Sequence, residues 1–204
     1  MTSEKYPLLT LSRLRMEIDG EGVTTLIAGA GCPLACKYCI NETVLKRVPT
    51  ILSPQALFDR VKCDDLYFQA TGGGVTFGGG EALLHAEFIR EFRTLCKDRW
   101  RIYAETSLNV PNKNIHIAAA CVDGFIVDIK DMNPEIYRSY TGADNAQVIE
   151  NLKLLISLVG QEKILVRVPL IPNFNTPEDQ ERSIAQLRNL GITRIDAFSY
   201  TVKK

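Results

Sequence analysis

The chain has 204 residues, of which 46% are hydrophobic, 24% charged and 8% aromatic, a length that suits one well-buried core and is short for two. Its 24 Lys and Arg residues balance 24 Asp and Glu residues, so bulk charge gives no support for binding nucleic acid or an anionic membrane. The N-terminal segment 1–22 lacks the apolar core of a signal peptide, and no later stretch reaches the roughly 18 apolar residues of a membrane span. These properties predict a single domain in a cytoplasmic protein.

Short apolar runs alternate with amphipathic stretches along the chain, which is the pattern of successive βα units. A strip over 13–19 predicts an edge strand or hairpin within an N-terminal extension, residues 1–20. The six predicted strands, rich in β-branched and aromatic residues, are 23–28, 74–77, 101–105, 124–129, 164–168 and 194–198. The predicted helices are 54–61, 85–98, 115–121, 134–140, 146–158 and 177–190.

A complete eight-fold β/α barrel takes about 250 residues, and this chain provides six units in fewer. The expected fold class is therefore α/β, with a partial, open (βα)6 TIM-like barrel of parallel strands formed by a single domain, residues 1–204. Such folds place their chemistry at the carboxyl ends of the strands.

The first predicted strand is followed by three cysteines in one glycine-flanked loop. Cys32, Cys36 and Cys39 are separated by three and then two residues. A structural zinc site takes four protein ligands, and both histidines, His85 and His116, lie far from the loop in sequence. Three thiolates suit a [4Fe-4S] cluster that leaves one iron open to another ligand. The spacing favours that cluster over the alternative of three unrelated buried thiols.

Two glycine triplets bracket the second predicted strand, and Glu81 follows the second triplet. Glycines let a ligand approach the backbone, although they serve tight turns and bulges equally well. Glu81 adds a carboxylate that could accept an ammonium group.

The spacing Cys32-x3-Cys36-x2-Cys39, with Tyr38 before the last cysteine and Gly-Gly-Glu ending at Glu81, resembles the radical S-adenosylmethionine superfamily. Within it, four further segments resemble the pyruvate formate-lyase activating enzymes, the activators of glycyl radical enzymes. These segments are Asp19-Gly20-Glu21-Gly22-Val23, Cys39-Ile40-Asn41, Gly73-Gly74-Val75-Thr76 and Asp128-Ile129-Lys130.

The resemblance implies that Cys32, Cys36 and Cys39 bind three irons of a [4Fe-4S] cluster, while the amino and carboxylate groups of S-adenosylmethionine chelate the fourth iron. One electron entering the cluster would cleave the C5′–S bond, giving methionine and a 5′-deoxyadenosyl radical that abstracts hydrogen from the substrate. The residues that the resemblance assigns to S-adenosylmethionine are Tyr38 beside the adenine, and Gly79, Gly80 and Glu81 around the methionine ammonium.

Polar residues at the other predicted strand ends suit the same cofactor. Glu105 ends the third strand, where the activating enzymes usually have Asp-Thr. Asp128 and Lys130 end the fourth strand and point to the same side, since side chains alternate along a strand. Arg167, late in the fifth strand, has a guanidinium suited to bidentate binding of a carboxylate. For each of the four, the alternative is a salt bridge at the barrel mouth. No catalytic residue beyond the cluster ligands is predicted.

The last predicted strand departs from the activating enzymes, which have Pro-Tyr-His where this chain has Ser-Tyr-Thr around Tyr200. Tyr200 could stack on the adenosine base or simply cover the open end of the barrel. The ferredoxin-like insertion of many activating enzymes is absent after the first motif, and the scattered Cys63, Cys96 and Cys121 are interpreted as structural.

The predicted function is that of a radical S-adenosylmethionine oxidoreductase that generates a glycyl radical on a partner enzyme. The implied partners are a flavodoxin- or ferredoxin-like electron donor and a glycyl radical enzyme, without nucleic acid or membrane. Three alternatives stay open at this point. The enzyme could act directly on a peptide, nucleotide or metabolite; the chain could be a non-catalytic iron–sulfur or zinc-binding module; or it could bind the cofactor without turnover.

Overall fold

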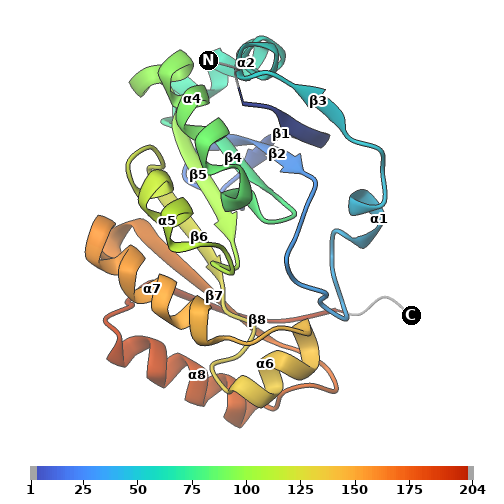
Figure 1. Cartoon of the computed structure of the whole chain (residues 1–204). Helices are drawn as coiled ribbons and strands as arrows, with labels where there is room; N and C mark the ends of the chain where they lie inside the picture. The colour runs from blue at the N-terminus through green and yellow to red at the C-terminus, as the bar shows by residue number, and fades with distance from the viewer. Residues whose placement is uncertain (1–3, 202–204) are drawn as a thin grey trace.

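A computed structural model describes residues 4–201 and shows one eight-stranded, open sheet with helices packed against it (Figure 1). The strands are β1 (Tyr6–Met16), β2 (Val23–Gly29), β3 (Thr50–Leu52), β4 (Gly74–Gly79), β5 (Arg101–Thr106), β6 (Gly124–Asp128), β7 (Ile164–Leu170) and β8 (Ile195–Ser199). The α-helices are α1 (Glu42–Leu45), α2 (Pro54–Val61), α3 (Asp65–Thr71), α4 (Ala86–Cys96), α5 (Asn112–Ala119), α6 (Pro134–Thr141), α7 (Ala146–Val159) and α8 (Pro177–Asn189). None of the helices in the described range is long and apolar enough to cross a membrane.

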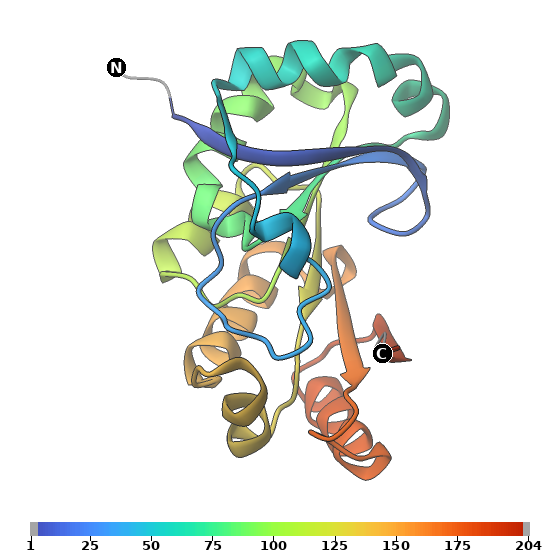
Figure 2. The same cartoon turned by 90° about the vertical axis from the view of Figure 1, so that its right-hand side faces the viewer.

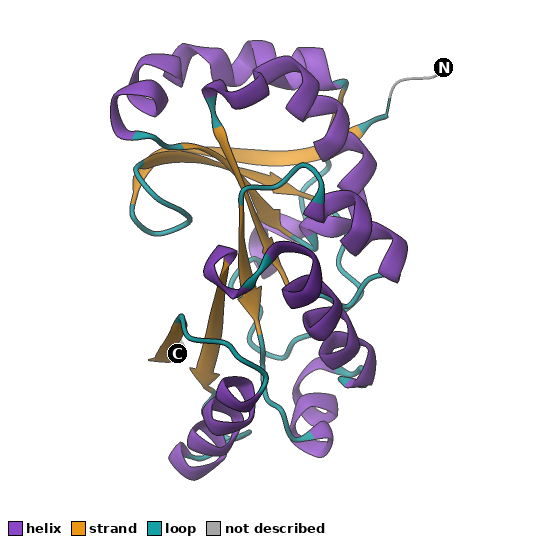
Figure 3. Cartoon of the chain, turned by 90° about the vertical axis from the view of Figure 1, so that its left-hand side faces the viewer, coloured by secondary structure: helices purple, strands orange, loops and turns teal. Residues whose placement is uncertain are grey.

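The strand order is β3-β1-β2-β4-β5-β6-β7-β8, and the sheet does not close. Six strands pair in parallel: β2, β4, β5, β6, β7 and β8. Strand β1 pairs antiparallel with both β2 and β3. The predicted open (βα)6 barrel is therefore confirmed, with two antiparallel strands added at one edge. Right-handed βα crossovers place the helices on the outer face of such a sheet, and Figure 3 shows them gathered along one side of the strands and at their ends.

The N-terminal strand differs from its prediction over 13–19. It runs over Tyr6–Met16, and Met16 pairs with Val23. The segment between them is the turn of this hairpin, in which Gly20 and Gly22 have φ of +143° and +68°, values that glycine adopts at little cost. The hairpin considered for this segment is confirmed, but its strand begins earlier, at Tyr6, and ends at Met16 because the turn glycines follow.

The predicted helices are confirmed within a few residues. Ser53 caps α2 by accepting from the Ala56 N–H, and Thr176 caps α8 in a capping box with Asp179. Helices α1 and α3 and the short strand β3 were not predicted from the sequence. Helix α3 buries one residue, Phe68, so it has no apolar periodicity from which to predict it.

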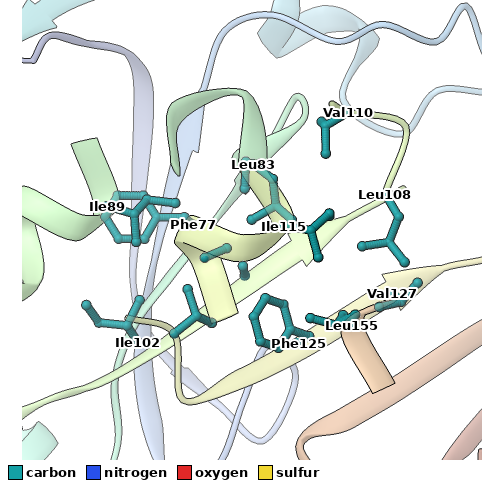
Figure 4. Close-up of a cluster of buried hydrophobic side chains, with 14 of the residues drawn as sticks. Phe77, Leu83, Ile89, Ile102, Leu108, Val110, Ile115, Phe125, Val127 and Leu155 are labelled. Atoms are coloured by element: carbon teal, nitrogen blue, oxygen red, sulfur yellow. The ribbon is translucent and has the colours of Figure 1, made fainter. Parts of the chain in front are cut away.

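The two faces of the sheet have different chemistry. Outward side chains of β4 to β7 pack against the helices in the apolar core; Figure 4 labels Phe77, Leu83, Ile89, Ile102, Leu108, Val110, Ile115, Phe125, Val127 and Leu155. The alternate residues line the inner face, where the register sets Asp128 beside Arg167. Glu105 lies on the same face, because its carboxylate meets the Arg167 guanidinium. The inner face of the open barrel therefore carries charged side chains near the carboxyl ends of its strands.

Candidate active site

The cysteine loop, which we define as residues 30–41, leaves the end of β2 and crosses the inner side of the sheet (Figure 2). Its backbone is attached to the C-terminal end of α6: Ala35 N donates to Thr141 O at 2.9 Å, and Lys37 N donates to Tyr140 O at 3.1 Å. The last carbonyls of a helix lack partners within the helix, so the loop satisfies them. The loop thereby links the two ends of the parallel sheet across the barrel mouth.

The three cysteines of this loop differ in exposure: Cys32 is exposed, whereas Cys36 and Cys39 are half-buried. Burial raises the pKa of Cys32, and it raises the pKa of Cys36 to about 11, opposed by the charge of Lys130. The neighbouring thiols add to both increases. A positive charge that acts on Cys36 favours the thiolate form needed for metal binding.

Within residues 4–201, no three His, Cys, Asp or Glu side chains are assembled tightly enough for a single metal ion. One zinc ion would draw its ligand sulfurs to about 2.3 Å from the same atom, whereas a [4Fe-4S] cluster binds each cysteine through a separate iron. His85, distant in sequence, does lie beside the loop, but its Nε2 contacts Ala30 O at 3.1 Å. The donor set of three thiols thus fits the cluster in number and kind.

Tyr38 belongs to an aromatic cluster at the barrel mouth. Its ring centroid lies 5.6 Å from that of Phe174 and 6.3 Å from that of Tyr140, and its hydroxyl accepts from Asn173 Nδ2 at 3.2 Å. Tyr140 continues the cluster to Tyr200, with 6.4 Å between ring centroids. Tyr38 therefore anchors the cysteine loop to the C-terminal half of the fold, and its contact with an adenine stays a prediction.

The glycines after β4 are required by the backbone of the neighbouring strand. A Cβ atom on Gly80 would come within 2.1 Å of Gly31 O, and one on Gly79, whose φ is +89°, within 2.8 Å of the Ala28 Cβ. Gly80 N donates to Gly29 O at 3.0 Å. In the structure, the atoms that lie against these two glycines belong to the neighbouring chain segment, at Ala28 and Gly31.

Glu81 is almost fully buried, 2% exposed, and its carboxylate accepts from four donors. Thr106 Oγ1 and Leu83 N lie 2.6 Å and 3.1 Å from Oε1, while Ser107 N and Ser107 Oγ lie 2.8 Å and 2.6 Å from Oε2. A carboxylate has about four acceptor positions, so these donors fill it. The carboxylate joins the end of β4 to the end of β5, and its contact with an ammonium group stays a prediction.

Glu105 and Arg167 form an ion pair on the inner face, with 2.8 Å between Glu105 Oε1 and Arg167 Nη1. Arg167 Nη2 also donates to Ile18 O at 2.7 Å, in the hairpin turn. Burial raises the pKa of Glu105 to about 7, opposed by the Arg167 charge and supported by Asp19 and Asp128. The salt bridge considered as the alternative for these two residues is thus present.

Lys130 is buried, 9% exposed, and its ammonium has two partners. Nζ lies 3.2 Å from Asp128 Oδ2 and donates to the Tyr200 hydroxyl at 3.1 Å. Burial alone would lower the pKa of Lys130, but Asp128 and Tyr200 raise it well above the ordinary value. The ammonium therefore stays charged at the barrel mouth, and whether Tyr200 stacks on adenosine or covers the open end stays a prediction.

The structure also places groups that sequence reasoning missed. Asn41 Nδ2 donates to Gly79 O at 2.7 Å. Tyr137 lies on α6, the helix whose last carbonyls hold the cysteine loop, and the charges that act on its hydroxyl are those of Cys36, Lys130, Glu81 and Cys32. Asn41 stood within a resembling segment, but no periodicity or spacing marked Tyr137.

The remaining cysteines are Cys96 and Cys121, both buried, and the exposed Cys63. The first two lie in the apolar core. Two cavities, of about 470 Å³ between the start of α6 and α8 and about 310 Å³ beside the hairpin turn, contain none of the cysteines among their lining residues.

Comparison with known proteins agrees with this geometry. A family model described as the radical SAM superfamily matches residues 26–183. The isethionate sulfite-lyase activating enzyme of Desulfovibrio desulfuricans is 37% identical, with 83% of this chain and 73% of that protein covered. The (2S)-3-sulfopropanediol dehydratase activating enzyme of Klebsiella oxytoca is 36% identical over 61% of this chain, which spans only 39% of that protein. The pyruvate formate-lyase 2-activating enzyme of Escherichia coli is 29% identical, with 87% and 71% covered.

Solved structures share the fold. SuiB of Streptococcus suis has a TM-score of 0.66 at 13% identity, with 88% of this chain and 40% of that chain covered. The native anSMEcpe structure with bound AdoMet has a TM-score of 0.63 at 18% identity, with 85% and 51% covered.

Proposed function

The chain belongs to the radical SAM superfamily, and from that premise we propose that it is an activating enzyme that generates a glycyl radical on a partner enzyme. The observation that supports the proposal most is the cysteine loop, which carries three thiols and is bonded to α6 across the mouth of an open barrel. The cofactors of the family are a [4Fe-4S] cluster and S-adenosylmethionine, and this donor set suits them.

We propose that Cys32, Cys36 and Cys39 bind the cluster. Held by these three residues, the cluster would supply one-electron reduction chemistry for cleavage of S-adenosylmethionine. The protein contributes position, charge and exclusion of water. Lys130 supports the thiolate form of Cys36 through its charge, and the α6 carbonyls fix the backbone on both sides of Cys36.

The inner-face charges would orient S-adenosylmethionine. Lys130, buried and charged, suits the carboxylate of the methionine portion, and Asp128 beside it suits a ribose hydroxyl or a cationic centre. Glu105 and Arg167 form the base of this surface. Glu81 acts as a positioning residue that holds the ends of β4 and β5 together, and Gly79, Gly80 and Glu81 are the residues proposed around the methionine ammonium.

The partner assignment rests on the named relatives, which activate isethionate sulfite-lyase, sulfopropanediol dehydratase and pyruvate formate-lyase. Each is an activating enzyme named for a protein substrate, so the substrate proposed for this chain is a glycine in a partner protein. A flavodoxin- or ferredoxin-like protein is the proposed electron donor.

A second candidate function is direct modification of a peptide, nucleotide or metabolite. The structural neighbours include SuiB bound to its precursor peptide, with a TM-score of 0.58 at 14% identity, and that likeness concerns the fold. The higher identity to the activating enzymes, 36% and 37%, favours the glycyl radical assignment. A non-catalytic iron–sulfur or zinc module is the alternative outside enzymes.

The test is electron paramagnetic resonance after anaerobic incubation of the reconstituted, reduced protein with S-adenosylmethionine and each candidate glycyl radical enzyme. A doublet signal that requires both proteins, and that is lost when the partner glycine is replaced by alanine, supports the proposal. S-adenosylmethionine cleavage with no radical on any glycyl radical enzyme, but with modification of a peptide or metabolite, would replace it by the second candidate. Metal binding with no cleavage would support the module.

A further inference from the structure

Tyr137 is a buried tyrosine without a hydrogen-bond partner. Its side chain is 0% exposed, it packs in the apolar core, and no atom of residues 4–201 accepts from or donates to its hydroxyl. A buried hydroxyl without a partner costs free energy, and tyrosines placed in cores usually satisfy theirs. The Tyr137 hydroxyl therefore has its donor capacity unused by the described residues.

The hydroxyl lies within electrostatic range of three separate segments of the candidate site. The charges that act on it belong, in decreasing order, to Cys36, Lys130, Glu81 and Cys32. Its own helix, α6, carries the carbonyls that hold the cysteine loop at Ala35 and Lys37. Burial raises the pKa of Tyr137, so the group stays a protonated phenol and offers one O–H donor.

Two of these charged groups are unsuited to accept from the Tyr137 hydroxyl. Lys130 is a donor and cannot accept. The Glu81 carboxylate already accepts from four donors. The remaining groups are the sulfur atoms on the side of Cys36 and Cys32, which accept weakly as thiols and strongly as thiolates or cluster sulfides.

We propose that the Tyr137 hydroxyl donates a hydrogen bond to a sulfur atom of the iron–sulfur cluster on its Cys36 side, and that this bond adjusts the reduction potential of the cluster. The proposal rests on the assignment of Cys32, Cys36 and Cys39 as cluster ligands. Hydrogen bonds to cluster sulfurs stabilise the reduced, more negatively charged form and so raise the potential. Tyr137 is then a cofactor-contacting residue that favours acceptance of the electron.

The test uses Tyr137→Phe, which removes the hydroxyl and keeps the ring. In the cluster-free protein the melting temperature should stay the same or rise, because the lost hydroxyl had no partner. After reconstitution the iron and sulfide contents should equal those of the wild type, while the midpoint potential falls. Electron–nuclear double resonance of the reduced cluster in H₂O and D₂O should lose one exchangeable proton coupling.

Tyr140→Phe is the matched control on the same helix, because its hydroxyl already donates to Tyr38 O at 3.3 Å. Its cluster-free melting temperature should fall, and the exchangeable coupling should remain. Tyr137→Phe with the wild-type potential and the wild-type coupling would overturn the proposal. A change that appears only after S-adenosylmethionine is added would overturn it too, since the acceptor would then be the cofactor carboxylate. If the wild type binds no cluster through its three cysteines, the proposed function fails first, and this outcome is seen before any Tyr137 variant is compared.

Discussion

The side-chain amide of Asn41 donates a 2.7 Å hydrogen bond to the carbonyl oxygen of Gly79. This bond joins the residue two positions after Cys39 to the glycine segment at the end of β4. The cysteine loop is therefore held in its middle, by α6 through Ala35 and Lys37, and at its C-terminal end, by β4 through Asn41. Two segments that are distant in sequence form one surface before any cofactor is bound.

Replacing Asn41 should loosen the cysteine loop without unfolding the protein. Asn41→Ala removes one half-buried hydrogen bond, whose net value is about 0.5–1.5 kcal/mol. We expect faster amide exchange over residues 32–41 and lower iron retention after gel filtration, with a small change in global stability. Gln147→Ala, which removes a similar amide-to-carbonyl bond to Val110 far from the loop, should leave iron retention unchanged. Wild-type iron retention in the Asn41 variant would show that the loop does not depend on this bond.

Glu81→Gln tests the positioning role of the buried carboxylate. An amide group has one acceptor oxygen, so its NH₂ group would face the donors now bound by one carboxylate oxygen. We expect the cluster-free protein to lose about 1–3 kcal/mol in urea unfolding. Glu150→Gln, on the exposed face of α7, is the control and should lose nothing measurable. A cluster-free Glu81 variant as stable as the wild type would mean that the carboxylate is free to serve a ligand.

Tyr200→Phe separates the hydroxyl of Tyr200 from its ring. The change removes the bond from Lys130 Nζ but keeps the ring, whose centroid lies 5.8 Å from the ammonium. A hydrogen bond to a charged group contributes about 1.5–3 kcal/mol, and Asp128 still partners Lys130, so we expect a loss near the lower end of that range. Calorimetric melting measures it, with the exposed Tyr67→Phe as control. Equal melting temperatures for Tyr200→Phe and the wild type would contradict a stabilising contact.

The raised pKa of Glu105 predicts a pH dependence of stability. Because burial raises this pKa from 4.5 to about 7, the folded protein binds more protons than the unfolded chain between those values. Its stability should therefore fall as the pH rises from about 4.5 to 7, by at most about 1.4 kcal/mol per pH unit for one proton. Glu105→Gln should remove that part of the slope in urea titrations, and Arg167→Met should extend the fall above pH 7. A slope identical in the Gln variant would refute the assignment.

The strands were predictable because each is a short apolar run bounded by glycines or charged residues. The helices were predictable where caps such as Ser53 and Thr176 precede an amphipathic segment. Helix α3 and strand β3 were not, because each buries a single side chain, Phe68 and Leu52, and so shows no period. The end of β1 depends on the turn glycines and on pairing with β2. The hydrophobic pattern within β1 carries no information about that pairing.

The residue types of the site could be predicted from the sequence, but their contacts could not. The spacing of the three cysteines identifies the cysteine loop whatever the fold of the rest of the chain. The partners of Glu81, in contrast, are supplied by Thr106 and Ser107 on another strand, and an acidic residue looks the same in sequence whether its oxygens are free or filled. Tyr137 resembles an ordinary core residue until the absence of a partner for its hydroxyl is known.

The most direct test of the account is chromatographic measurement of 5′-deoxyadenosine formed from S-adenosylmethionine, after anaerobic reconstitution with iron and sulfide and reduction with dithionite. The account predicts product from the wild type and from Cys63→Ser, whose thiol is exposed and outside the loop. It predicts none from the variant in which Cys32, Cys36 and Cys39 are replaced together by serine. Product formation by that triple variant, or a fully loaded wild-type cluster that yields no 5′-deoxyadenosine, would contradict it.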